Sequence, residues 1–354
     1  MYIYYIVLII FGILAFKDLL ISTVLNKYIL TTLIIISLVF FIGFRYNSDN
    51  DYWTYVFLYD MVPAFPDVNA LFSMSILQGQ ELGFLFIESI LRTLGLGYQS
   101  VFIFSAIITT FFLYKAYSRI VSFPVLALFV FFAQYFLQMF IQIRFGIATA
   151  ISLYACTFLS TDKKRLFWLL SLTAFFFHFS SLGIITVYFF YKINWNRKKN
   201  IYLFFLICAI VTVLPLRKLL ENILLVTGIE RYQNYLFDNA MEIRTLIFNV
   251  IIIIPLILFR KSIIKKNIDI NLFFAMAFNN IFVGAFVWQL SILYRFSTIS
   301  GSIFCVIIPS YLLLFKSFSM KVCGYFFLFL YCFLKFLPAM RYVSEYQIFL
   351  SVKG

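Results

Sequence analysis

Runs of apolar residues long enough to cross a bilayer dominate this chain, and short charged segments separate them. A membrane-spanning helix needs roughly 20 such residues, or fewer where it is short or broken. Only 12% of the residues are charged, about half the fraction found in soluble proteins. We therefore expect an all-α polytopic membrane protein with about 12 transmembrane helices, in one transmembrane domain over residues 1–354. The predicted spans are 2–16, 28–44, 98–114, 122–140, 145–160, 166–177, 180–191, 200–216, 245–259, 270–292, 298–315 and 321–337.

Charge and cysteine content exclude several other classes of protein. The formal net charge is +14, but the basic residues form short clusters between apolar runs, unlike a nucleic-acid-binding surface. The first run, 2–16, lacks a basic leader and a small-residue cleavage site, so we expect a retained helix. The five cysteines lie in apolar runs without ligand spacing, so we expect inert core thiols and no metal site.

The two short runs 166–177 and 180–191 meet at His178, the only histidine. One interpretation is a single tilted helix that contains His178. The alternative is a helical hairpin, because basic clusters precede and follow the pair and the positive-inside rule places both in the cytoplasm. Only an even number of crossings satisfies that rule, so we expect a helix break at His178 near the outer face.

The same rule gives a consistent topology for the whole chain. The predicted cytoplasmic basic segments are Lys17/Lys27, Lys115/Arg119, Lys163–Arg165, Lys192–Lys199, Arg260–Lys266 and Lys316/Lys321. Two long outer segments remain, 45–97 and 217–244, and both chain ends also lie outside. The first outer segment contains a predicted interfacial helix near 81–92, on which Glu88 and Arg92 form an i,i+4 pair.

The first outer segment begins with closely spaced aromatic and charged residues. Tyr and Trp favour the membrane–water boundary because their rings are amphipathic, so an ordinary aromatic belt explains this stretch taken alone. The same rings are platforms for sugars. The predicted glycan-binding residues are Arg45, Tyr46, Tyr52, Trp53, Tyr232 and Tyr235.

The predicted topology places several ionisable residues on the outer side, namely Arg45, Asp51, Glu81, Arg144, His178, Arg231 and Arg295. An arginine in so apolar a sequence is costly unless it faces a cavity or a partner. This favours a function for Arg144 and Arg295 over snorkelling at a helix end.

Each of the other residues also has a structural interpretation. The alternatives are a solvated loop charge for Arg231, a pair with Asp49 or Asp51 for Arg45, a hydrogen-bonded turn position for His178, and a pair with Arg92 or a first-turn carboxylate for Glu81. Asp49, Asp60 and Asp67 are interpreted as solvated loop charges.

Several arginines on one outer face suit a polyanion, because guanidinium groups bind phosphates bidentately and stay charged. A lipid-linked pyrophosphate is such a polyanion at a membrane surface. A carboxylate or histidine that accepts a hydroxyl proton, together with aromatic platforms, then favours glycosyl transfer. No divalent metal is needed where arginines neutralise the departing pyrophosphate.

Six short motifs occur in order between about residues 40 and 315: Arg45–Tyr52, Glu81-Leu82-Gly83-Phe84, Arg144–Ala148, Phe177–Ser181, Tyr232-Gln233-Asn234-Tyr235 and Tyr294-Arg295-Phe296. In these motifs the sequence resembles the EpsG-like branch of Wzy-type polysaccharide polymerases, which includes O-antigen polymerases. One departure is Asp49, which stands where the family has Gly and alters the expected turn but not the expected pairing of Arg45 with Asp51.

The resemblance implies a GT-C-like/Wzy architecture in the bacterial inner membrane with the active site on the periplasmic face. It implies transfer of a growing glycan from undecaprenyl pyrophosphate onto a new lipid-linked repeat unit, without a cofactor. It also implies a Wzx-type flippase and a Wzz-type chain-length regulator as partners.

The roles follow from these expectations. Arg144, Arg295 and Arg231 hold the donor pyrophosphate, and His178, Glu81 or Asp51 activates the acceptor hydroxyl. A lipid-linked oligosaccharide flippase is an alternative, although no internal repeat is visible. An O-antigen ligase is another alternative, because it shares the chemistry, whereas a scaffold role does not explain the costly arginines.

Overall fold

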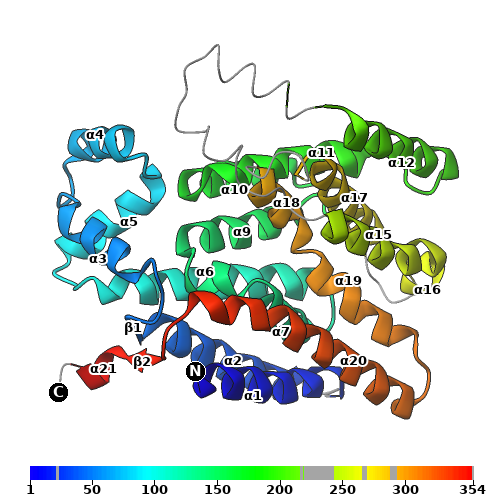
Figure 1. The fold of residues 1–354 in the computed structure, drawn as a ribbon, viewed down its shortest axis with the longest axis horizontal. Coiled ribbons are helices and arrows are strands. Elements are labelled where there is room, and N and C mark those ends of the chain that lie inside the picture. Colours follow the sequence, from blue (N-terminus) through cyan, green and yellow to red (C-terminus); the bar gives the residue numbers. More distant parts are fainter. Residues whose placement is uncertain (21–23, 216–217, 219–242, 265–268, 288–292, 353–354) are drawn as a thin grey trace. The chain divides into compact units, whose positions relative to one another are not determined.

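The computed structural model describes residues 1–20, 24–215, 218, 243–264, 269–287 and 293–352. Helices dominate this part of the chain (Figure 1), because a helix pairs its own backbone polar groups where lipid offers no partners. Six helical segments in it are long and apolar enough to cross a membrane: Tyr2–Leu20, Leu25–Gly43, Gln99–Ile120, Ile270–Val287, Tyr294–Leu314 and Phe318–Tyr342. Shorter apolar helices accompany them. The protein is an all-α polytopic membrane protein, as predicted.

Within the described residues, every predicted span overlaps at least one helix. Spans 122–140 and 298–315 are each divided among shorter helices, and spans 200–216 and 270–292 end outside the described residues. The break expected at His178 separates an α-helix that ends at Phe177 from a 3-10 turn that begins at Phe179. The helix predicted near 81–92 is observed as α5, Leu82–Thr93, and its position at a membrane interface stays a prediction.

The chain packs as two compact units. The first consists of Met1–Ala155, Trp168–Phe179 and Phe315–Gly354, and the second of Cys156–Phe167 and Ser180–Leu314. The first unit contains α1 (Tyr2–Leu20), α2 (Val24–Gly43), β1 (Arg45–Tyr46), α3 (Tyr52–Met61), α4 (Val68–Gln78), α5 (Leu82–Thr93), α6 (Gln99–Ile120), α7 (Pro124–Gln134), α8 (Phe136–Phe140), nearly all of α9 (Ile143–Cys156), most of α10 (Lys164–Phe177), α20 (Phe318–Phe336), η5 (Leu337–Tyr342), β2 (Gln347–Ile348) and α21 (Phe349–Val352).

Helix α7 lies at the centre of the first unit. Its residues from Val125 to Ala133 are all buried, and α1, α6 and α20 pack around it. Asp18 of α1 accepts hydrogen bonds from the first free amides of α7, at Val125 (2.9 Å) and Leu126 (3.3 Å). A carboxylate in this position satisfies amides that have no partner within the helix.

Residues 45–97, which were predicted to be the first outer segment, fold onto the end of α6. Helices α3, α4 and α5 gather there (Figure 1), and a two-stranded antiparallel sheet joins Arg45 and Tyr46 to Ile348 and Gln347. The hydroxyl of Tyr4 donates a hydrogen bond to the carbonyl of Ser344 at 3.1 Å. The beginning of α1, the end of α2 and the C-terminal strand therefore meet at one end of the first unit.

The second unit contains nearly all of η1 (Phe179–Leu182), then α11 (Gly183–Lys192), α12 (Lys198–Val213), α15 (Ile243–Leu258), α16 (Arg260–Ile264), α17 (Ile270–Val287), α18 (Tyr294–Gly301), α19 (Phe304–Ser310) and η4 (Tyr311–Leu314). Its centre is α17, which is buried from Leu272 to Ile281 and packs against α11, α12, α15 and α18. Aromatic rings fill this centre, and the rings of Trp195 and Phe278 lie 4.4 Å apart.

The cysteines differ from the prediction at one position. Cys156, Cys208, Cys305 and Cys332 are buried, whereas Cys323 is exposed. Cys323 lies on α20, whose outer face carries large exposed apolar side chains such as Phe326 and Phe327. It therefore lies on an apolar helix surface and not in the core.

Candidate active site

Glu81 directly precedes α5 and is held close to the end of α10. Two residues later, Gly83 packs so tightly against α10 that an added Cβ would lie 2.8 Å from the carbonyl oxygen of Phe176. Phe84 and Leu85 then bury the first turn of α5. The Glu-Leu-Gly-Phe motif therefore fixes the position of the Glu81 carboxylate, because only glycine allows this contact.

Arg144 lies in the first turn of α9. The neighbouring Gly146 brings α9 against the preceding segment, and an added Cβ would lie only 2.1 Å from the carbonyl oxygen of Gln138. Arg144 Nη1 donates to Glu81 Oε2 at 2.5 Å and also donates to Gln80 Oε1. The Arg-x-Gly motif therefore positions the Arg144 guanidinium against the Glu81 carboxylate at the start of α5.

Aromatic rings surround the guanidinium of Arg144. Its Cζ lies 5.9 Å from the ring centroids of both Tyr55 and Phe84, close enough for an attraction between the cation and the ring faces. The side chains of Arg144 and Glu81 remain 24% and 19% exposed. The pair is therefore shielded from bulk solvent but still accessible to a ligand.

His178 is the third member of this cluster. Its Nε2 lies 3.8 Å from Glu81 Oε1, and its ring centroid lies 5.0 Å from that of Phe145. One oxygen of Glu81 thus contacts Arg144 while the other faces His178. A carboxylate held between a cation and an imidazole is able to accept or relay a proton.

Glu88 lies two turns beyond Glu81 on α5 and is completely buried. Neither carboxyl oxygen has a hydrogen-bond partner among the described residues. Burial raises the pKa of this carboxyl to about 8, although the positive charge of Arg144 lowers it in part. Burial therefore favours the neutral, protonated form of Glu88.

The predicted Glu88–Arg92 ion pair is wrong. Arg92 Nη1 donates instead to the backbone carbonyls of Asp60 and Val62, each at 2.6 Å. These carbonyls lie at the end of α3, and the last carbonyls of a helix have no partners within it. Arg92 therefore ties α5 to α3 and leaves Glu88 without a counter-ion on its own helix.

Arg45 lies in the interior and not on a glycan surface. Its side chain is 0% exposed, and Nε donates to Asp49 Oδ2 at 2.8 Å. The guanidinium lies between the rings of Phe102 and Phe140, with Cζ 4.5 and 4.7 Å from their centroids. The expectation that Arg45 contacts glycan is thus replaced by a structural role.

The ion pair of Arg45 also corrects two details of the turn. Asp49 was expected either to be a solvated charge or, like Asp51, to pair with Arg45; it is buried and it, not Asp51, is the partner of Arg45. The Asp51 amide donates to Asp49 Oδ1 at 3.1 Å, and Asn47 has a φ of 44°. Asp51 itself is half-buried at the start of α3.

The aromatic residues of this stretch divide into an exposed and a buried set. Trp53 is 50% exposed and donates from Nε1 to Asn47 Oδ1 at 2.8 Å. Tyr46 is half-buried and meets Trp53 edge to face. Tyr52 is fully buried and stacks on Phe102. Of the predicted glycan platforms in the described residues, Trp53 and Tyr46 are accessible and Tyr52 is not.

The remaining predicted site residues lie elsewhere. Arg231, Tyr232 and Tyr235 lie outside the described residues, and their roles stay predictions. Arg295 is exposed in the first turn of α18, in the second unit, and its role also stays a prediction. The described residues contain no group of three His, Cys, Asp or Glu side chains arranged to hold a metal ion.

Two polar members of the site were not identified from the sequence. Gln80 was missed because a neutral amide in a loop has no distinctive pattern, although it precedes the Glu-x-Gly-Phe motif directly. Glu88 was assigned to the exposed side of its helix, because its spacing from Arg92 matched a surface pair. The side of an amphipathic helix that is buried depends on its neighbours, here α3, α4 and α6.

The fold and this site define a polytopic membrane protein in which an arginine, a carboxylate and an imidazole form a cluster near the aromatic residues of α3. A model of the EpsG family matches residues 28–349, nearly the whole chain. The protein therefore belongs to the EpsG family, whose members resemble Wzy-type polymerases and act in polysaccharide biosynthesis. No curated protein and no solved structure matches the chain.

Proposed function

We propose that this protein is a surface-polysaccharide polymerase, and in particular an O-antigen polymerase. It transfers the growing glycan from undecaprenyl pyrophosphate onto the terminal sugar of a new lipid-linked repeat unit. The observation that carries this proposal is the Arg144–Glu81–His178 cluster, in which Glu81 contacts Arg144 at 2.5 Å and faces His178 at 3.8 Å. Family membership supports the same chemistry.

The proposed reaction is a displacement at the anomeric carbon of the donor glycan. The acceptor hydroxyl oxygen forms a bond to that carbon while the bond to the pyrophosphate oxygen breaks. The bonding electrons leave with undecaprenyl pyrophosphate, and the hydroxyl proton passes to a base. Atoms and charges balance without an oxidant or reductant.

Arg144 stabilises the leaving pyrophosphate in this proposal. A guanidinium has five N–H donors, and the bonds to Gln80 and Glu81 both use Nη1. Donors aimed at the developing negative charge typically contribute two to three orders of magnitude in rate. Arginine rather than a metal ion supplies the positive charge, so we expect activity to persist in a chelator.

Glu81 or His178 accepts the proton of the acceptor hydroxyl. The contact with Arg144 orients the Glu81 carboxylate, and His178, whose Nε2 lies 3.8 Å from Glu81 Oε1, can receive the proton next. Trp53, which is exposed, and Tyr46, which is half-buried, are accessible rings that could bind the sugars of the acceptor. The reaction takes place on the periplasmic side of the inner membrane, between a Wzx-type flippase and a Wzz-type chain-length regulator.

The experiment is a gel of surface polysaccharide from cells that lack this chain and are complemented with the wild type or with Arg144→Ala. We expect single repeat units on the lipid core in the deletion strain, a ladder with the wild type, and no ladder with Arg144→Ala. The matched control is Arg341→Ala, an exposed arginine of the same unit, which should restore the ladder.

Other outcomes of this experiment assign other functions. Bare lipid core with accumulated lipid-linked polymer would show a ligase. Unpolymerised repeat units on the cytoplasmic leaflet would show a flippase. A normal ladder with Arg144→Ala, expressed at wild-type levels, would exclude Arg144 from the reaction.

A further inference from the structure

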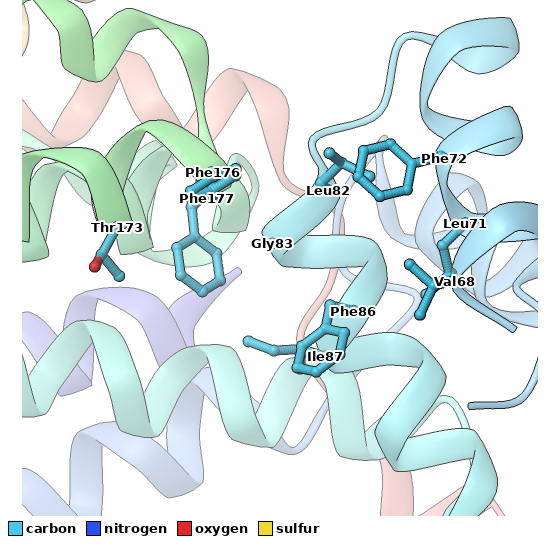
Figure 2. A pocket seen from close by; sticks show the side chains of 10 residues that line it. All are labelled: Val68, Leu71, Phe72, Leu82, Gly83, Phe86, Ile87, Thr173, Phe176 and Phe177. Atoms are coloured by element: carbon cyan, nitrogen blue, oxygen red, sulfur yellow. The ribbon is translucent and has the colours of Figure 1, made fainter. Parts of the chain in front are cut away.

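An apolar cavity of about 400 Å³ opens beside the candidate active site. Side chains of α4, α5 and α10 line it (Figure 2): Val68, Leu71, Phe72, Leu82, Gly83, Phe86, Ile87, Thr173, Phe176 and Phe177. Thr173 is the only lining residue with a polar side chain, and its hydroxyl donates to the carbonyl of Leu169 in its own helix. A ligand in this cavity therefore meets almost no hydrogen-bonding groups.

Two chain segments contribute to both the cavity wall and the charged cluster. Leu82 and Gly83 follow Glu81 directly, and Phe177 precedes His178 directly. The close contact of Gly83 with the backbone of Phe176 holds these two segments together. A molecule that binds at Glu81 and His178 thus has an apolar recess immediately next to it.

The cavity also continues into the apolar surface of the first unit. Phe72, Phe86 and Phe176 line the cavity and are 50%, 44% and 40% exposed. Leu172 of α10, one helical turn before Phe176, is also exposed. A hydrocarbon chain longer than the cavity can therefore extend along this surface into the surrounding lipid.

These features restrict the chemistry of the occupant. A sugar is excluded because its hydroxyl groups would lose their hydrogen bonds to water without replacement. Hydrocarbon fits, and the volume lies within the range of about 300–1,000 Å³ typical of ligand pockets. The adjacent Arg144 favours a hydrocarbon that ends in an anionic group, and so selects an amphiphile with a phosphate-type head.

We propose that this cavity binds the isoprene units nearest to the pyrophosphate of the donor lipid. The inference rests on the proposed function, since it assigns the pyrophosphate to Arg144. Branched, flat isoprene units pack well between aromatic rings, which here come from all three helices. In this arrangement the cavity fixes the tail while Arg144 holds the head, and the scissile bond is thereby positioned at Glu81 and His178.

The test uses the full-length protein in nanodiscs with two photoreactive probes. The first is geranylgeranyl pyrophosphate with a diazirine on the isoprene unit next to the head, and the second is phosphatidylcholine with a diazirine on one acyl chain. Thr173→Phe fills the cavity from α10. Leu169→Phe places the same ring one turn away, outside the lining, and is the matched control.

We expect the isoprenoid probe to label peptides that contain 68–72, 82–87 or 173–177. Unlabelled geranylgeranyl pyrophosphate should compete, and unlabelled geranylgeraniol should compete less well. Thr173→Phe should reduce labelling about tenfold or more, the scale set by loss of a few buried carbons, whereas Leu169→Phe should not. Val68→Phe fills the cavity from α4 and serves where Thr173→Phe fails to fold.

Three results would overturn the assignment. They are equal labelling of these peptides by the phospholipid probe without competition, labelling by the isoprenoid probe at other peptides, and unchanged labelling in both filled variants. The polysaccharide gel distinguishes failure of this inference from failure of the proposed function. Specific labelling of a chain whose deletion leaves the ladder intact would retain the cavity assignment and exclude the polymerase.

Discussion

Arg144 Nη1 lies 2.5 Å from Glu81 Oε2, although 63 residues separate the two in the chain. Glycine contacts place both partners, at Gly146 for the arginine and at Gly83 for the carboxylate. The ion pair is partly exposed, so it is not a buried device that only stabilises the fold. We interpret it as a preorganised site in which each charged group orients the other before substrate binds.

This pairing predicts that the losses of activity from the two residues are not additive. Glu81→Gln and Arg144→Gln should each reduce the polymerisation rate by about 100-fold, since each removes a charge-assisted contact. The rate loss of the double variant should be far smaller than the product of the two single-variant losses, because groups that act as one unit couple by about 0.5–3 kcal/mol. The measurement is incorporation of labelled repeat units by membranes. Strictly multiplicative losses would show that the two residues act independently.

The sequence was sufficient to predict much of this arrangement. The apolar runs predicted the helices because a chain segment in lipid must hydrogen-bond its own backbone polar groups. The positive-inside rule predicted the break at His178, and the topology placed Glu81, Arg144 and His178 on one side. Their mutual contacts could not be predicted, because they depend on which turn of α5 meets α9 and α10, and this is decided by packing.

The errors have a common physical cause. Arg45 and Glu88 are charged by sequence and were assigned to polar surroundings, yet both are completely buried. Sequence pattern offers partners by spacing, such as Asp49 or Asp51 for Arg45 and Arg92 for Glu88, but it does not decide between them. The tertiary structure instead selects the partner that satisfies the buried group, as Asp49 does for Arg45, or leaves a carboxyl neutral, as at Glu88.

The buried Arg45–Asp49 pair predicts a large effect on stability. Asp49→Ala leaves an uncompensated guanidinium in the interior and should lower the free energy of unfolding by about 3–5 kcal/mol. Lys164→Met removes an exposed ion pair with Asp162 and should have little effect. Thermal unfolding in detergent, followed by tryptophan fluorescence, measures both. Equal stability of the two variants would contradict a structural role for Arg45.

The close approach at Gly146 predicts that even one methyl group disturbs the site. Gly146→Ala should reduce stability by about 1–3 kcal/mol, as overpacking does, and should abolish the ladder by displacing Arg144. Gly97→Ala is the matched control, because an added Cβ there meets no atom within 4 Å. A normal ladder with Gly146→Ala would show that the start of α9 tolerates displacement.

The exposure of Trp53 predicts a role in binding and not in folding. Trp53→Ala should weaken extension of the glycan by about tenfold, the scale of one lost aromatic stack, without changing the unfolding temperature. Phe57→Ala, which removes another exposed ring of α3, controls for loss of apolar surface. The readout is the length distribution of the ladder. Similar shortening in both variants would argue against a specific sugar platform at Trp53.

The neutral carboxyl of Glu88 predicts a dependence of stability on pH. Its pKa of about 8 in the folded protein lies above the ordinary value of 4.5, so between these values the folded state holds a proton that the unfolded state has released. Stability should therefore fall as pH rises from 4.5 toward 8, by at most about 1.4 kcal/mol per pH unit. Glu88→Gln mimics the neutral form and should remove this slope.

Loss of the Glu88 proton should also lower the polymerisation rate at alkaline pH. Above pH 8 an ionised Glu88 competes with Glu81 for the positive charge of Arg144, so the polymerisation rate of the wild type should decline there. Glu88→Gln should match the wild type at pH 7 and keep its rate above pH 8, whereas Glu345→Gln, at an exposed carboxylate, should follow the wild type throughout. If wild type and Glu88→Gln lose activity in the same way above pH 8, the group that titrates there is not Glu88.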